Sequence, residues 1–124
     1  MVKLSKITVI VLFLILLITV NVYAGGAGVQ LSWDAPTTNV DGTPLTDLAG
    51  YNIYYGTESG SYAHSINVGN VLTYSFSISE DLNRTYYFAA TAYDTSANES
   101  EYSNEVSKYL DGRPECLVFI SIEV

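Results

Sequence analysis

The amino-acid sequence predicts an all-β fold, a two-sheet sandwich or a small barrel, and three observations support that prediction. Apolar and polar residues alternate within residues 29–33, 51–55, 74–78 and 86–93, the pattern of half-buried antiparallel strands. Turn-forming residues separate these runs at 41–42, 59–60, 69–70 and 94–101. After residue 24 no segment carries an apolar stripe at helical spacing, so the pattern indicates short strands joined by regular turns.

The inward phase of these strands predicts the hydrophobic core. Aromatic rings are abundant on this phase, and they supply most of the apolar area that a domain of this size can bury. Trp33, the only tryptophan, shares its phase with Val29 and Leu31, and we therefore expect it inside the fold. The other rings expected inside are Tyr51, Tyr55, Tyr74 and Tyr86.

Residues 1–24 have the composition of a secretory signal peptide, followed by a domain at 25–110 and a tail at 111–124. Lys3 and Lys6 precede an apolar run at 7–20, and Ala24 is a small residue suited to cleavage. This run is shorter than the roughly 20 residues of a membrane-spanning helix. We therefore expect a secreted or periplasmic protein, which contacts the membrane only if the segment stays uncleaved as an anchor.

The charge of the remaining chain argues against nucleic-acid partners. Without residues 1–24, only Arg84, Lys108 and Arg113 stand against all 13 acidic residues, a net charge of −10. Such a surface repels phosphate backbones. The single cysteine, Cys116, permits no internal disulfide, so the core alone must hold the domain together.

Four segments, in this order, resemble the fibronectin type III family. VQLSWDAP at 29–36 is similar to its B strand and GYNIYYG at 50–56 to its C strand. TYYFAATAYD at 85–94 is similar to its F strand, and SNEVS at 103–107 to the start of its G strand. The resemblance covers residues 29–109, and DLAGY at 47–51 and NES at 98–100 are typical of bacterial secreted members. It implies an immunoglobulin-like sandwich of two antiparallel sheets.

The resemblance also implies two structural residues and one departure. Leu82 matches the leucine of the corner between strands E and F, and Tyr86 matches the tyrosine whose hydroxyl bonds to nearby backbone there. Only the glycine-rich residues 25–28 precede the B strand, so the A strand is predicted to be short or missing.

No catalytic group is predicted, and neither a metal nor a cofactor is expected. His64, the only histidine, lies in a polar stretch with no nucleophile motif beside it. Asp94, Ser96, Asn98 and Glu105 have the first, third, fifth and twelfth positions of a calcium loop, but Glu99 replaces the glycine that such a loop requires. The favoured interpretation is that Asp94 and Asn98 hydrogen-bond the turn to itself.

These observations favour a non-catalytic binding or spacer module outside the cytoplasm, whose partner is an unknown protein or a cell-surface polysaccharide. The alternative is a carbohydrate-binding protein that uses an exposed strip of Tyr54, Tyr87 and Tyr93 on the outward phase of the C and F strands. Tyrosine is also common on exposed sheet faces, which favours the first interpretation.

The tail carries a separate prediction. Residues 117–122, LVFISI, have high β-propensity and low charge. An absent A strand leaves the edge of the B strand open, and open edges invite pairing. We therefore expect the tail to pack onto its own sandwich or to add as a strand to a neighbouring copy; the alternative is a disordered terminus or the remnant of a longer protein.

Overall fold

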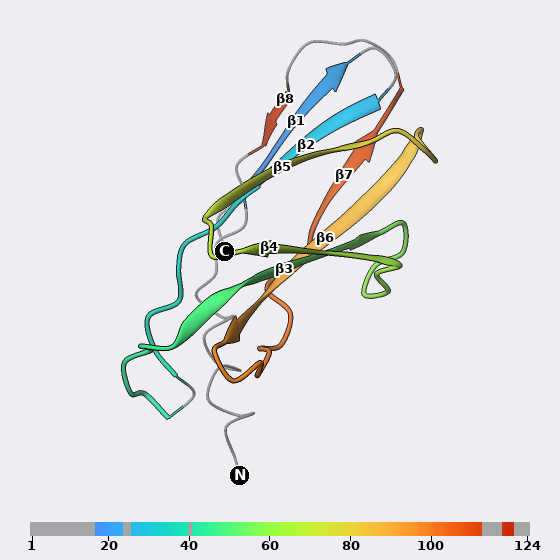
Figure 1. Cartoon of the computed structure of the whole chain (residues 1–124). Helices are drawn as coiled ribbons and strands as arrows, with labels where there is room; N and C mark the ends of the chain where they lie inside the picture. The colour runs from blue at the N-terminus through green and yellow to red at the C-terminus, as the bar shows by residue number, and fades with distance from the viewer. Residues whose placement is uncertain (1–16, 24–25, 40, 113–117, 121–124) are drawn as a thin grey trace.

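The chain folds into two four-stranded antiparallel sheets that face each other (Figure 1). The computed structural model describes residues 17–23, 26–39, 41–112 and 118–120. The strands are β1 (Leu17–Tyr23), β2 (Gly26–Ser32), β3 (Leu48–Gly56), β4 (His64–Gly69), β5 (Thr73–Ile78), β6 (Arg84–Asp94), β7 (Val106–Leu110) and β8 (Val118–Ile120). We call the sheet ordered β5-β2-β1-β8 the β2 sheet, and the sheet ordered β4-β3-β6-β7 the β3 sheet.

The alternation in the sequence places one face of each sheet in the core. Val29 and Leu31 of β2 and Ile53 of β3 are fully buried, as are Phe88 and Ala90 of β6. Burial of a Val, Leu, Ile or Phe side chain stabilises the fold by about 1.5–3 kcal/mol relative to its exposed state. Among the described residues no helix is long and apolar enough to cross a membrane.

Aromatic rings join the two sheets at both ends of the core. Trp33, directly after β2, is 4% exposed and meets the buried ring of Tyr51 edge-on at 5.3 Å between centroids. At the other end, Tyr55 of β3 contacts Phe76 of β5 at 5.2 Å. The rings that the strand phase predicts inside therefore lie inside, although Tyr55 and Tyr74 are only partly buried.

The corner before β6 is held by Tyr86. Its hydroxyl donates to the backbone carbonyls of Glu80 (3.1 Å) and Asp81 (3.3 Å), and its ring is 4% exposed. Leu82, between the corner and β6, packs partly buried against the core. Asp81 and Asn83 both have positive φ, which lets the chain turn sharply at this corner.

The first strand differs from the sequence expectation. Instead of a short or missing A strand, β1 forms a seven-residue strand that pairs with β2 over its whole length, from Leu17↔Ser32 to Tyr23↔Gly26. This strand comes from the segment assigned to the signal peptide. The reason is compositional: Ile, Thr and Val suit both the apolar run of a leader and a pleated strand. Most of that segment, including the predicted cleavage residue Ala24, lies outside the described residues.

Part of the tail forms the strand β8, which belongs to the β2 sheet. It pairs with β1 through Ile18↔Ile120, Thr19↔Phe119 and Val20↔Val118. The tail therefore packs onto its own sandwich, one of the two expected arrangements, but its partner is β1 and not the B strand. The B strand, β2, has no open edge because β5 and β1 flank it. Cys116 lies outside the described residues.

The sequence also missed one strand. His64 was expected in a polar stretch, but it opens β4, which pairs with β3 from Tyr55↔His64 to Tyr51↔Gly69. The alternation of apolar and polar residues was weak here because β4 is an edge strand and none of its side chains is fully buried. The ring of His64 stacks on Tyr55 at 4.8 Å.

Candidate functional site

The outer face of the β3 sheet carries the candidate site. Asn52 and Tyr54 of β3 point outward because they alternate with the buried Tyr51 and Ile53. The register pairs Asn52 with Thr91 of β6, so three polar side chains from neighbouring strands share one face.

Residues 99–105, which we call the 99–105 segment, run alongside β6 without forming a strand there. Two serines attach the segment to β6. The backbone N–H groups of Ser100 and Ser103 donate to the carbonyls of Ala92 and Ala90, each at 2.8 Å. Their hydroxyls accept from the N–H groups of the same two alanines, at 2.9 and 2.8 Å. Side chains of the segment are thereby held beside the outward face of β3 and β6.

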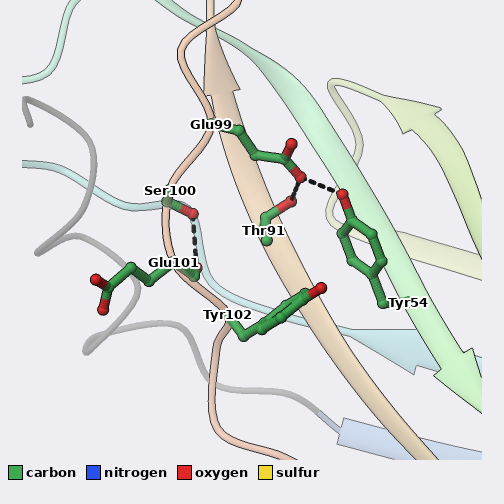
Figure 2. A pocket seen from close by; sticks show the side chains of 6 residues that line it. All are labelled: Tyr54, Thr91, Glu99, Ser100, Glu101 and Tyr102. Carbon is green, nitrogen blue, oxygen red and sulfur yellow. Dashed lines mark hydrogen bonds between the residues drawn. The ribbon is translucent and has the colours of Figure 1, made fainter. Parts of the chain in front are cut away.

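Glu99 is fixed by three donors. Figure 2 shows two of them, Tyr54 and Thr91. The hydroxyls of Tyr54 and Thr91 and the amide of Asn52 all donate to Oε1 of Glu99, the amide at 3.1 Å. Partial burial acts to raise the pKa of Glu99, but the hydrogen bonds from Thr91, Tyr54 and Asn52 outweigh it and hold the pKa below its ordinary value. Burial and the neighbouring Glu99 raise the pKa of Tyr54 to about 12. At neutral pH the pair is a carboxylate and a neutral phenol.

Glu105, at the other end of the segment, is held in the same way. Its carboxylate accepts from the hydroxyl of Ser59 (2.6 Å), the N–H of Gly60 (2.8 Å) and the hydroxyl of Tyr62 (2.6 Å). Burial opposes ionisation, but these hydrogen bonds hold the pKa of Glu105 below its ordinary value. Burial, followed by the bond to Glu105, raises the pKa of Tyr62.

Three tyrosines connect the two carboxylates. Tyr102 packs edge-on against Tyr54 at 5.0 Å and against Tyr62 at 5.1 Å, with interplanar angles of 80° and 71°. Tyr54 and Tyr62 are 6.4 Å apart. Tyr102 is 51% exposed, whereas the other two rings are partly buried. The result is one exposed ring between two ionised carboxylates.

An open pocket of about 560 Å³ lies at this cluster. It is lined by Tyr54, Thr91, Glu99, Ser100, Glu101 and Tyr102 (Figure 2). None of these lining residues is basic, so the pocket presents rings, hydroxyls and carboxylates.

The predicted tyrosine strip is placed differently. Tyr54, Tyr87 and Tyr93 are all partly buried, and among the described residues none of these rings contacts another of the three. Tyr93 lies over Gly50, where an added Cβ would come within 2.5 Å of its hydroxyl. The same hydroxyl exchanges hydrogen bonds with Asn67 at 3.0 and 3.2 Å. Of the three, only Tyr54 lines the pocket.

The calcium-like spacing does not bring its residues together. Both oxygens of the Asp94 carboxylate are used within the turn: Oδ1 accepts from the N–H groups of Ser96 and Asn98, and Oδ2 from the Asn98 amide. Glu105, the twelfth position, is bound to the 59–62 turn instead. Among the described residues no cluster of three or more metal-ligating side chains is found.

Sequence reasoning missed Tyr62, Tyr102, Glu99 and Glu105 as members of one cluster. The members lie up to 43 residues apart, and neither the 59–62 turn nor the 99–105 segment has a periodic pattern. The available signal was weak: two acidic residues flank Tyr102 at a distance of three positions each.

Comparisons with solved structures identify the fold. The chain aligns with a human fibronectin type III domain, derived from KIAA0970 protein, with a TM-score of 0.67 and 17% identity over 98% of this chain and 90% of that one. The fold is that of a fibronectin type III domain. In that fold's terms, β1 to β7 are strands A, B, C, C′, E, F and G, and β8 is an addition beside strand A.

A second similarity is to part of an enzyme. The chain aligns with the β-1,2-glucanase of Parabacteroides distasonis with a TM-score of 0.54 and 20% identity, over 81% of this chain but only 13% of the glucanase. No family model matches the sequence. No curated protein matches it either.

Proposed function

We propose that this chain is a non-catalytic binding module that acts outside the cytoplasm. The observation that supports binding is the pocket beside Tyr102, where an exposed ring lies next to fixed carboxylates on the outer face of the β3 sheet. Pockets of a few hundred Å³ with rings and a few oriented polar groups are typical of ligand sites.

The protonation states of the pocket favour binding over catalysis. A general base works best with a pKa near the operating pH. The pKa of Glu99 is instead held below its ordinary value, so its carboxylate is a weak base toward the Thr91 hydroxyl. The pKa of Tyr54, about 12, makes its phenol a weak acid. Both groups are suited to stay in one charge state while a ligand binds.

Export is the second part of the proposal. Its support is the leader-like composition of residues 1–24 and the acidic character of the rest of the chain. Expression of the whole chain in a bacterial host, followed by mass measurement of the extracytoplasmic product, tests it. We expect a product that begins at Gly25. A product that retains Met1 and stays with the membrane would replace export with anchoring.

Binding is tested by retention on the immobilised chain. The whole chain is exposed to culture supernatant, with and without added cell-wall polysaccharide, next to a Tyr102→Leu variant and a Tyr109→Leu control. Tyr109, on β7, is 54% exposed, close to the 51% of Tyr102, and contributes nothing to the pocket. We expect a retained partner that the Tyr102 variant loses and the Tyr109 variant keeps. Equal retention on all three would overturn the assignment of binding to this pocket.

A carbohydrate-binding role through the tyrosine strip has less support. Sugar platforms present rings as a flat exposed surface, whereas Tyr54, Tyr87 and Tyr93 are all partly buried. In the retention experiment, loss of the partner upon addition of polysaccharide would favour the carbohydrate role.

A further inference from the structure

The pocket beside Tyr102 offers acceptors and negative charge but few free donors. The donor groups of Tyr54, Thr91 and Asn52 are all directed to Oε1 of Glu99. Among the described residues no donor contacts the other oxygen, Oε2 of Glu99. A ligand that brings its own hydrogen-bond donors therefore suits the carboxylate of Glu99, because the hydroxyls of Tyr54 and Thr91 are already used by that carboxylate.

The charge of the site selects a cation. Glu99 and Glu101 both line the pocket, and no basic residue does. The hydrogen bonds that hold the pKa of Glu99 low keep its negative charge in place at neutral pH. The whole chain carries a net charge of −8, which attracts positively charged partners over a longer range.

The exposed ring of Tyr102 supplies the second contact for such a ligand. An aromatic face attracts a cation placed over it, and a guanidinium can also stack on the ring. The rings of Tyr54 and Tyr62 are less available because both are partly buried and Tyr102 packs against them. The crossed rings provide no flat platform for a sugar, but one exposed face is enough for a planar cation.

We propose that this pocket binds an arginine side chain of a partner polypeptide, with the guanidinium stacked on Tyr102 and bonded to Glu99. Arginine fits better than lysine because its planar group offers several donors to a carboxylate while it stacks on a ring. The 560 Å³ volume and the open mouth leave room for the backbone on either side of the arginine. This inference rests on the proposed binding function and adds the chemical class of the ligand.

The test is an NMR titration of the ¹⁵N-labelled whole chain with two short peptides. One is acetyl-Gly-Gly-Arg-Gly-Gly-amide, and the other replaces arginine by citrulline, which has nearly the same shape but no charge. We expect saturable shifts of the backbone amides of residues 99–102 with the arginine peptide only. Added salt should weaken the binding.

Matched variants locate the interaction. Glu99→Gln keeps an oxygen for the three donors but removes the charge, and Tyr102→Leu removes the ring. Each should weaken binding of the arginine peptide about two- to fivefold, the expected size of an exposed ion pair or cation–π contact. The controls are Glu58→Gln and Tyr109→Leu, which change an exposed carboxylate and an exposed tyrosine outside the pocket, and both should bind like wild type. Melting temperatures of all four variants verify that the fold is kept.

Several outcomes would overturn the inference: equal shifts with the arginine and citrulline peptides, shifts centred elsewhere, equal effects of Glu58→Gln and Glu99→Gln, or shifts only with an added oligosaccharide. These outcomes differ from failure of the proposed function. If the retained partner still depends on Tyr102 while the arginine peptide does not bind at residues 99–102, the binding function stands and its assigned chemistry is wrong.

Discussion

The outer faces of the two sheets differ in chemistry although the strands beneath them are built alike. On the β3 sheet, the outward positions of β3 and β6 include Asn52, Tyr54 and Thr91, and the 99–105 segment adds three carboxylates and a ring. On the β2 sheet, β2 and β5 present small polar side chains, with a Gln30–Thr73 hydrogen bond of 3.3 Å between them. The groups that the proposed binding would use are therefore concentrated on one sheet, while the described β2–β5 half of the other mainly closes the core.

The sheets also differ in the parts of the chain that form them. All four strands of the β3 sheet lie between residues 48 and 110. The β2 sheet takes its two remaining strands, β1 and β8, from residues 17–23 and 118–120. Removal of the predicted leader would thus change the β2 sheet and leave every strand of the β3 sheet in place. The predictions below test how far the two sheets depend on each other.

The largest effect is expected where the sheets share their core. Trp33→Ala should lower the free energy of unfolding by about 3–5 kcal/mol, because it empties the space beside Tyr51 between the two sheets. Urea denaturation measures the loss. Native tryptophan fluorescence provides the check: emission typical of a water-exposed ring would contradict the burial of Trp33.

Starting the chain at Gly25 should lower stability, because it removes β1 and with it the backbone pairing of β1 with β2 and β8. It exposes the edge of β2 and takes away the strand on which β8 pairs. We expect a lower melting temperature and concentration-dependent association through the opened edge. Deletion from Asp111 onward in the same protein should reduce that association if the tail is the added strand. A monomer with unchanged melting temperature in both cases would show that the β2 sheet does not need its terminal strands.

Asp94→Ala tests the turn that follows β6. Asp94 is 2% exposed and accepts three hydrogen bonds from Ser96 and Asn98, so its loss should cost about 1–3 kcal/mol. The loss should be the same with and without millimolar calcium, and calorimetry should detect no saturable calcium heat. A calcium-dependent rise in melting temperature that disappears in this variant would mean that the turn is a metal site.

The corner of Tyr86 allows a matched pair of substitutions. Tyr86→Phe removes the hydroxyl that bonds to Glu80 and Asp81 and should cost about 1 kcal/mol. Tyr87→Phe, on the outward phase of the same strand, should cost almost nothing. Chemical denaturation measures the free energy of unfolding of both variants. Equal losses would contradict the inward position of Tyr86 and the outward position of Tyr87.

The smallest effect concerns acid stability of the β3 face. The folded-state pKa values of Glu99 and Glu105 lie below their ordinary value of 4.5, so both carboxylates stabilise the fold at neutral pH. That contribution should be lost as the pH falls below about 4.5, through the lower folded-state pKa values. Glu99→Gln and Glu105→Gln should each flatten the fall of the denaturation midpoint in acid. Glu58→Gln is the control. If the denaturation midpoint of all three variants falls with pH as steeply as that of the wild type, Glu99 and Glu105 do not contribute to acid stability.

The fold was largely predictable because burial on one face of a strand leaves a trace in the sequence. The runs at 51–55, 74–78 and 86–93 lie within β3, β5 and β6, and 29–33 overlaps β2. The exposed edge strand β4 left a weaker trace and was missed. β1 was not predicted as a strand because the same apolar β-branched residues suit both a leader and a strand, and local composition cannot separate the two uses.

The sequence alone determined the alternation, and with it the inward place of Trp33 and the outward place of Tyr54; the corner role of Tyr86 was implied by the resemblance to the fibronectin type III family. Only the tertiary structure decided that Tyr54, Tyr62 and Tyr102 contact one another. It also decided that the hydroxyls of Tyr54 and Tyr62 donate to Glu99 and Glu105. The physical reason is that alternation is a local property of one strand, set by which face is buried. The cluster depends instead on strand register and on how an irregular segment bonds to β6, and both are fixed by contacts between residues far apart in the chain.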